Sequence, residues 1–145
     1  MEIIIATPNG VIYDKKAKSI TLPTESGVVT ILDDHQPMIS LLKAGEIGIT
    51  EDEETPDFIM SVSTGVLEVQ PESHIYIMAD TAERAEDIDI ALAQEAMAKA
   101  KQELEKQDQL DDIDFARLQA MIDKELARIT VGKKYREIRN SLSHN

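Results

Sequence analysis

The chain has 145 residues and a formal net charge of −13, with 42% hydrophobic and only 3% aromatic residues. An acidic, aromatic-poor composition argues against nucleic-acid binding, which needs a basic surface to neutralise phosphates. The sequence contains no cysteine, which excludes a disulfide framework, a thiol nucleophile and a thiolate metal site.

The length suits one ordinary domain, or a small sheet domain with a helical appendage. The first apolar run, Ile3 to Ile5, is ended by Thr7 and Pro8 and does not resemble a signal peptide. The longest uncharged apolar runs are far shorter than the roughly 18–20 residues of a membrane-spanning helix. We therefore expect any membrane association to depend on a partner protein.

The first half of the chain alternates apolar and polar residues with a period of two, which is typical of strands with one buried face. The expected strands cover residues 2–7, 11–13, 17–22, 28–32, 38–42, 47–49, 58–63, 66–69 and 75–78. A charged bend is expected at residues 14–16, and a solvated acidic hairpin tip at residues 51–56. Eight to ten short strands predict an antiparallel β-sandwich or barrel with one polar face.

The pattern changes within residues 79–106, where apolar residues begin to recur every three or four positions, as in a helix. One expected seam contains Ala93, Ala96, Ala100 and Leu104, and a second contains Phe115, Leu118, Ile122, Leu126 and Ile129. Acidic residues at the two helix starts, Asp87, Asp89, Asp111, Asp112 and Asp114, are expected to be caps. Because the linker at residues 106–110 is short, we predict an antiparallel α-helical hairpin.

This division predicts two domains, a β-sandwich at residues 1–85 and a C-terminal helical hairpin at residues 86–145. Acidic residues outnumber basic residues 15 to 5 in the first and 13 to 10 in the second. The last 22 residues reverse this balance through Lys124, Arg128, Lys133, Lys134, Arg136 and Arg139. A basic tail on an acidic protein can fold back on its own domain or bind an acidic partner.

Asp33, Asp34 and His35 form a cluster that suggests a metal or acid–base site. Adjacent loop residues point in divergent directions, and two acids with one histidine are a weak ligand pattern, so a solvated contact loop is the simpler interpretation. Ser26 and Gly27 lack the strand–turn–helix context of a serine nucleophile, and no glycine-rich phosphate loop is present. The sequence favours a binding or regulatory protein over an enzyme.

Three passages resemble the epsilon subunit of bacterial F-type ATP synthases. They are residues 26–38 with 42–45, residues 64–69, and residues 79–85 (ADTAERA) leading into Ile88 and Asp89. The third passage is the most specific, and it lies at the change from strand to helix, where the family has it. The resemblance covers nearly all of the chain, from Thr7 to Val131.

The resemblance implies a non-catalytic central-stalk subunit of the rotor, which couples the flow of protons or sodium ions through the membrane ring to ATP synthesis. It implies that the sandwich binds the gamma subunit and rests on the ring. The expected ring contact is the loop Ile31, Leu32, Asp33, Asp34, His35, Gln36 and Pro37. It also implies a peripheral location at the cytoplasmic face of the bacterial plasma membrane.

The resemblance further implies a hairpin with two states, folded against the sandwich or extended toward the catalytic beta subunits, where it inhibits ATP hydrolysis. The alanine seam supports this hypothesis, because alanines stabilise docking less than the ~1.5–3 kcal/mol of a fully buried leucine. Weak docking permits two states. The basic tail fits the acidic loops that the family's catalytic subunits present.

Some bacterial members bind ATP on the folded hairpin through the motif Ile/Leu-Asp-x-x-Arg-Ala. Ile88, Asp89 and Ala93 match this motif, but Leu92 stands in place of the arginine. The other candidate nucleotide contacts are Glu83, Lys99, Lys124 and Arg128. Losing one charge-assisted contact costs roughly 1.5–3 kcal/mol, about ten- to a hundredfold in affinity, so we expect weak or absent ATP binding and no other cofactor.

Two alternatives to a rotor subunit remain. One is a nucleotide-sensing binding module that uses the helical hairpin, against which Leu92 argues. The other is a hydrolase that uses Asp33, Asp34 and His35. Stoichiometric copurification with a coiled-coil rotor partner is expected for the rotor subunit alone.

Overall fold

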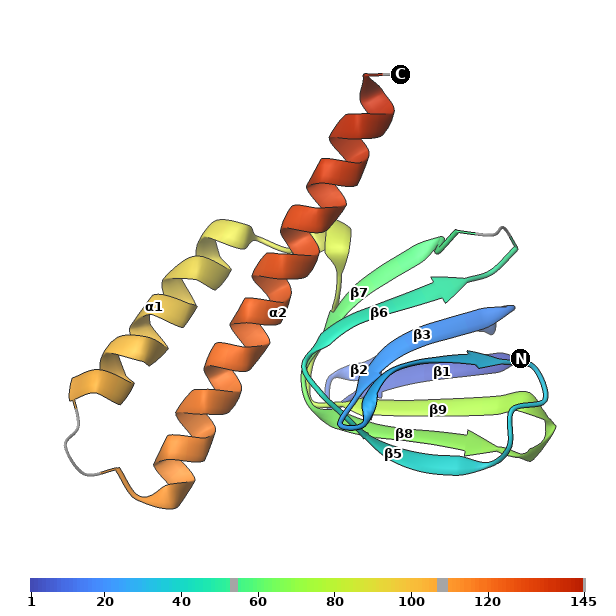
Figure 1. Ribbon diagram of the computed structural model, residues 1–145, viewed down its shortest axis with the longest axis horizontal. Coiled ribbons are helices and arrows are strands. Elements are labelled where there is room, and N and C mark those ends of the chain that lie inside the picture. Colours follow the sequence, from blue (N-terminus) through green and yellow to red (C-terminus); the bar gives the residue numbers. More distant parts are fainter. Residues whose placement is uncertain (53–54, 107–109, 145) are drawn as a thin grey trace.

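The computed structural model describes residues 1–52, 55–106 and 110–144, and these residues form ten strands followed by two long helices (Figure 1). The strands are β1 (Glu2–Thr7), β2 (Gly10–Lys16), β3 (Ser19–Thr24), β4 (Gly27–Leu32), β5 (Met38–Leu42), β6 (Gly45–Thr50), β7 (Phe58–Val62), β8 (Gly65–Gln70), β9 (His74–Ala79) and β10 (Ala82–Arg84). The helices are the short 3-10 turns η1 (Pro71–Ser73) and η2 (Ala85–Asp87), and the α-helices α1 (Ile90–Lys106) and α2 (Asp112–Ser143). The predicted β-sandwich followed by a helical hairpin is confirmed.

The strands pair in the order β10-β7-β6-β3-β5-β8-β9-β1-β2, with β4 added beside β3. β3 and β5 share a single pair, Thr24 with Leu42, so the sheet folds over at this point and its two halves face each other. The described pairs are antiparallel except for β1 with β9, which run parallel. We expected antiparallel strands throughout, because turn signals in a sequence reveal which strands are neighbours along the chain and not how distant strands pair.

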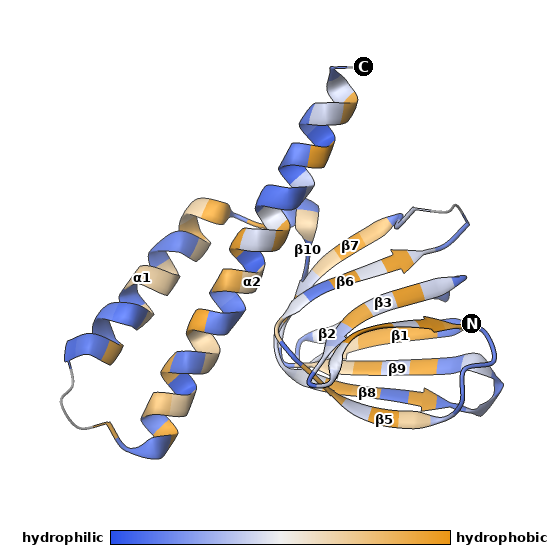
Figure 2. Ribbon diagram, in the orientation of Figure 1, coloured by the Kyte–Doolittle hydropathy of each residue, from blue (hydrophilic) through white to orange (hydrophobic). Residues whose placement is uncertain are grey.

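The core lies between the two halves of the sheet and is built from alternate residues of the strands. Figure 2 shows that apolar residues are frequent along these strands. In β1, Ile3 and Ile5 are fully buried, which is the period of two in its simplest form. Tyr13 connects β2, at one end of the strand order, with β7, near the other end. Its hydroxyl donates to Glu51 Oε1 at 2.9 Å, and its ring contacts the ring of Phe58 in β7 at a centroid distance of 5.2 Å. Burial, reinforced by this hydrogen bond, raises the pKa of Tyr13 and keeps the hydroxyl protonated.

Two strands differ from the prediction. Residues 14–16 are not a bend but the end of β2, where they pair with residues 2–4 of β1. Charged side chains are compatible with this position because β2 is an edge strand. β10 was not predicted, since three residues are too few to show a period, and it pairs with residues 60–62 of β7. Part of the predicted acidic tip, residues 53–54, lies outside the described residues.

Both α-helices begin at acidic residues that the sequence indicated. Asp89 Oδ1 accepts the backbone N–H of Leu92 at 3.0 Å, and Asp111 Oδ1 accepts that of Asp114 at 2.7 Å. These bonds satisfy amides that have no partner within the helix, so the predicted capping is confirmed at these two positions. Asp87 instead lies in η2. Residues 107–109 of the predicted linker lie outside the described residues.

α1 and α2 lie antiparallel and pack against each other (Figure 1). Ala93 and Ala100 of the predicted alanine seam are buried, and Ala100 forms a cluster with Leu118 and Ile122 of α2. The predicted seam of α2 is wrong at Phe115 and Leu126, which are 50% and 51% exposed. The reason is that α2 has two partners, α1 and the sandwich, so its buried residues do not follow a single line.

α2 makes the main contact between the helices and the sandwich, where it packs on β6, β7 and η2. The alanine seam therefore joins the two helices, and our interpretation of it as a measure of docking onto the sandwich is wrong. α2 also continues as a helix to Ser143, so the predicted basic tail is helical and projects past the sandwich (Figure 1). Neither described α-helix is both long and apolar enough to cross a membrane.

Candidate functional site

The junction between the helices and the sandwich has a small apolar centre. This junction cluster contains Ala85, Ile88, Ile90 and Val131, with Ile59 and Tyr135 at its margin. Gly132 permits the close approach of α2, because a Cβ there would lie 3.0 Å from Cγ1 of Ile90 and 3.2 Å from Cγ2 of Ile88. The cluster fastens α2 to the segment that connects the two halves of the molecule.

Arg128 adds an ionic cross-link at the same junction. Its Nε donates to Oε2 of Glu83 on β10 at 2.8 Å, and its Nη1 donates to Oε2 of Glu125 at 2.8 Å. Lys124 Nζ lies 3.8 Å from the other carboxylate oxygen of Glu125. Burial works against the charge of Arg128, but the hydrogen bonds with Glu83 and Glu125 outweigh it and raise the pKa of the guanidinium. The negative charges of Glu83 and Glu125 balance the positive charges of Lys124 and Arg128 in this cluster. The cluster connects α2 to β10.

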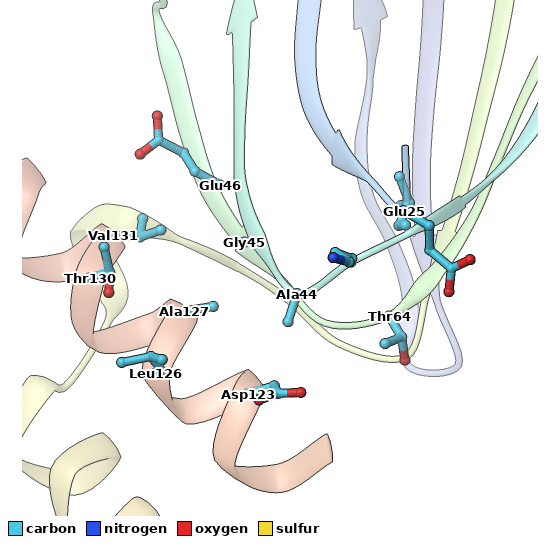
Figure 3. A pocket seen from close by; sticks show the side chains of 12 residues that line it. Glu25, Ala44, Gly45, Glu46, Thr64, Asp123, Leu126, Ala127, Thr130 and Val131 are labelled. Atoms are coloured by element: carbon cyan, nitrogen blue, oxygen red, sulfur yellow. The ribbon is translucent and has the colours of Figure 1, made fainter. Parts of the chain in front are cut away.

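A cleft of about 620 Å³ separates the middle of α2 from the sandwich (Figure 3). Its helix side is formed by Asp123, Leu126, Ala127, Thr130 and Val131, and its sandwich side by Glu25, Thr64 and residues 42–46. Leu126, which the sequence placed in the helix–helix seam, lines this cleft. The helices thus touch the sandwich along only part of α2.

The structure gathers three of the seven proposed nucleotide contacts. Glu83, Lys124 and Arg128 line a cleft of about 330 Å³ at the junction. Any phosphate bound there would compete with the carboxylates of Glu83 and Glu125 for Arg128. Their existing pairing gives a second reason, besides Leu92, to expect weak nucleotide binding.

The other four proposed contacts lie elsewhere. Ile88 and Ala93 are buried, and Asp89 is the cap of α1. Lys99 is on an exposed face of α1, where its Nζ lies 3.3 Å from Oε1 of Glu95. The hairpin alone therefore does not bring all seven residues into one pocket.

The proposed ring-contact loop, residues 31–37, lies at the end of the sandwich away from the helices (Figure 1). Ile31 is buried in the core, whereas Leu32 is 60% exposed and residues 33–37 are also exposed. The ring of His35 contacts the backbone oxygen of Gln36. No group of three or more histidine, cysteine, aspartate or glutamate side chains suited to a metal ion occurs among the described residues.

This loop is held in a defined shape by its neighbours. Asp33 pairs with the amino group of Met1 at 2.8 Å, and this hydrogen bond lowers the pKa of the carboxyl. The backbone N–H of Asp34 donates to Oγ of Ser73 at 2.9 Å. Asp34, Glu72 and Ser73 all have φ near +60°, a conformation that residues other than glycine seldom adopt. The loop at residues 31–37 and the turn at residues 72–73 together form a solvent-facing end of the sandwich with a defined shape.

The outer face of one half of the sheet is apolar, although a polar outer face was expected. Cross-strand pairs place Leu41 of β5, Val66 of β8, Met78 of β9 and Ala6 of β1 in one row. The neighbouring row contains Ile39, Tyr76 and Ile4, interrupted by Glu68. We call these seven apolar residues the outer apolar face; Ile39 is 74% and Met78 66% exposed.

The sequence carried a signal for this face that we did not use. Runs such as residues 3–5, 38–39 and 75–78 are apolar at successive positions, so both faces of the strand are apolar. An exposed apolar patch on a folded domain commonly marks a protein–protein contact.

Comparison with protein families matches both halves of the chain. The model for the β-sandwich domain of the ATP synthase delta/epsilon chain matches residues 1–85, and the model for its long α-helix domain matches residues 86–133. The ATP synthase epsilon chain of Thioalkalivibrio sulfidiphilus is 38% identical over 125 residues, which are 86% of this chain and 86% of that protein. That of Nitrosococcus oceani is 36% identical over 137 residues, covering 94% and 95%.

Two solved structures share the fold. One is from a mitochondrial ATP synthase of Euglena gracilis (TM-score 0.67, 18% identity, 83% of this chain and 74% of that chain). The other is from the central stalk and c-ring of the Tetrahymena thermophila mitochondrial ATP synthase (TM-score 0.67, 13% identity, 91% and 96%). At these identities the likeness concerns the fold alone.

The fold and its surfaces define a class of protein, a β-sandwich that carries a helical hairpin at one end and exposes surfaces suited to binding. Both family models match, and relatives more than 30% identical match over most of their length. The chain belongs to the ATP synthase delta/epsilon chain family and is a non-catalytic subunit of that complex.

Proposed function

We propose that the chain is a central-stalk rotor subunit of a bacterial F-type ATP synthase. Residues 1–85 couple the membrane ring to the rotor shaft, and residues 86–145 inhibit ATP hydrolysis when they leave the sandwich. The observation that carries this proposal is that both domains of the family occur in one chain and meet at one small junction. The complex acts at the cytoplasmic face of the plasma membrane, to which this subunit is held through its partners.

The gamma subunit binds the outer apolar face in this proposal. The rows that contain Leu41 and Ile39 run across four neighbouring strands, and a shallow cleft of about 220 Å³ lies within them. Covering this face removes apolar area from water at roughly 25 cal/mol per Å². A partner with a complementary apolar surface therefore gains binding energy without any rearrangement of the sandwich.

The membrane ring binds the end of the sandwich that carries the loop at residues 31–37, away from the helices. Leu32 offers an exposed apolar side chain there, and Asp33 and Asp34 offer charge. Because the loop is tied to Met1 and Ser73, it presents these groups in a fixed arrangement. A fixed arrangement is suited to transmitting torque between the ring and the shaft. The coupled ion is a proton or sodium.

The regulatory role of the hairpin rests on the narrowness of its junction. Four residues form the buried junction cluster, and the 620 Å³ cleft leaves much of α2 unsupported by the sandwich. A small contact area makes the free energies of the docked and extended states comparable, which is the condition for a two-state switch. In the extended state the basic end of α2 reaches the catalytic beta subunits.

Locking the hairpin tests this role. The chain has no native cysteine, so Glu83→Cys with Arg128→Cys places one reactive pair across the junction. A short bifunctional thiol reagent should then hold the hairpin docked in the assembled complex and raise ATP hydrolysis. Each single cysteine variant, treated with the same reagent, serves as the control. Hydrolysis that is equal before and after cross-linking overturns the inhibitory role.

A second experiment tests the shaft contact. Met78→Asp puts a charge in the outer apolar face, and Val28→Asp puts the same charge on β4, which lies outside that face. We expect Met78→Asp to reduce copurification with the gamma subunit by tenfold or more, about 1.4 kcal/mol, and Val28→Asp to leave it unchanged. Equal recovery of both variants contradicts the assignment of this face.

A further inference from the structure

α2 continues beyond the helical domain that the family model describes. The match ends at residue 133, whereas the helix ends at Ser143. The two residues that follow the match, Lys134 and Tyr135, both reach the sandwich. They are therefore placed to affect how α2 docks.

Lys134 connects α2 to β6. Its Nζ donates to both carboxylate oxygens of Glu46, at 2.9 Å and 3.1 Å. This contact joins residues 88 positions apart and exists only while α2 lies on the sandwich. It lies about 1.7 helical turns beyond Arg128, so α2 is held by ion pairs at two points along its axis.

Tyr135 connects α2 to β7 and η2. Its partly buried ring packs against the junction cluster. It also lines a cleft of about 240 Å³ with Phe58, Ile59, Arg84 and Glu86. The ring thus adds an apolar contact at the margin of the junction cluster.

The contacts weaken sharply beyond these residues. Ile138 is 41% exposed and Leu142 is 72% exposed, although both follow Tyr135 at helical spacing. The last two turns of α2 therefore provide built-in controls, because they share the helix but not its packing on the sandwich.

We propose that Lys134 and Tyr135 form a clasp that holds the hairpin docked and so sets the fraction of chains in the extended state. This inference rests on the proposed two-state hairpin and deepens it by naming what holds the docked state in this chain. Arg128 connects α2 to β10, and the clasp connects α2 to β6 and β7. Loss of the clasp leaves the contacts with β6 and β7 weakened, so the docked state loses stability.

Hydrogen–deuterium exchange of the 145-residue chain and of its variants tests the clasp. In Tyr135→Ala, and in a chain ended after Lys133, we expect exchange at residues 82–90 to rise roughly three- to tenfold. Lys134→Ala should give a smaller rise, because an exposed ion pair contributes less than an apolar contact. Tyr135→Phe keeps the ring and should exchange like the unmodified chain.

The matched control is Leu142→Ala, which removes an apolar side chain from the same helix beyond the clasp. Exchange at residues 82–90 that is unchanged in Tyr135→Ala, or that rises equally in Leu142→Ala, overturns the clasp. Circular dichroism confirms that each variant keeps its helices, so that faster exchange reports undocking.

ATP hydrolysis by the assembled complex separates the two proposals. Stronger inhibition in Tyr135→Ala, together with faster exchange, supports both the clasp and the inhibitory hairpin. Faster exchange with unchanged hydrolysis supports the clasp and overturns inhibition by the helices. Unchanged exchange overturns the clasp whatever the rate of hydrolysis.

Discussion

The sandwich and the hairpin keep their shapes in different ways. The described residues of the sandwich contribute seventeen buried side chains to one core, drawn from strands that pair across long stretches of sequence. The described residues of the hairpin and of its junction with the sandwich form two smaller buried clusters, of four and three residues. A body with a large core must unfold as a whole to change shape, whereas an element with small contacts can move while it keeps its helices. The molecule thus combines a rigid part with a movable one.

The two regions also differ in how they use charge. In the described part of the sandwich, charged side chains lie outside the core, which is apolar. At the junction, Arg128 and Lys134 carry much of the specific contact between α2 and the sandwich. Ion pairs that are partly exposed respond to salt and to competing partners, which an apolar core does not. The junction is accordingly where the molecule is open to regulation.

The largest effect is expected from a cavity in the sandwich core. Leu67 is fully buried, and Leu67→Ala should reduce the free energy of unfolding by about 2–5 kcal/mol. The loss should lower the midpoint of urea denaturation for the whole sandwich. Ile39→Ala, at an exposed position of β5, should change the midpoint little. Similar midpoints for the two variants contradict a single cooperative core.

A leucine-to-alanine substitution in the hairpin is expected to have a smaller effect on stability, confined to the two helices. Leu118 is 1% exposed between α1 and α2, and Leu118→Ala should cost about 2–3 kcal/mol, at the lower end of the range for such substitutions. The helical circular dichroism signal should melt at a lower temperature while the strand amides keep their protection from exchange. If the helical signal and the protection of the strand amides are lost together, the hairpin and the sandwich unfold as one unit.

Removal of the ionic cross-link tests the junction between the two regions. Arg128→Met keeps most of the side-chain volume but leaves Glu83 and Glu125 without the guanidinium, at a cost of about 1–3 kcal/mol. Faster exchange at residues 82–84 of β10 is the expected readout. Adding Glu125→Gln should restore part of the protection, because it removes the unpaired buried charge. If protection does not recover, the ion pairs of Arg128 are not the source of the faster exchange.

The smallest effect is expected from restoring the arginine of the nucleotide motif. Leu92→Arg should increase ATP affinity by no more than about tenfold, or 1.4 kcal/mol, because Arg128 remains held by two carboxylates. Calorimetric titration of the full-length chain measures this affinity. A micromolar dissociation constant for the unmodified chain would refute weak binding and favour a nucleotide sensor.

Local pattern was enough to predict most of the elements. Period-two runs located nearly all the strands, and the acids at Asp89 and Asp111 marked the starts of both helices. Such features depend on a few neighbouring residues, so they can be recognised without knowing the fold. The family resemblance added the expected role of each of the two domains. β10 was missed because so short a strand has no period of its own.

Contacts between distant parts of the chain could not be predicted from local sequence pattern. Arg128 lies 45 positions from Glu83, and Lys134 lies 88 positions from Glu46. The parallel pairing of β1 with β9, the two-sided burial of α2 and the outer apolar face are likewise products of which elements meet. A one-dimensional pattern states that a side chain is apolar or charged, but its partner depends on the folded path of the backbone. The sequence thus specified the elements and the family, and the three-dimensional packing specified the junction through which the hairpin is held.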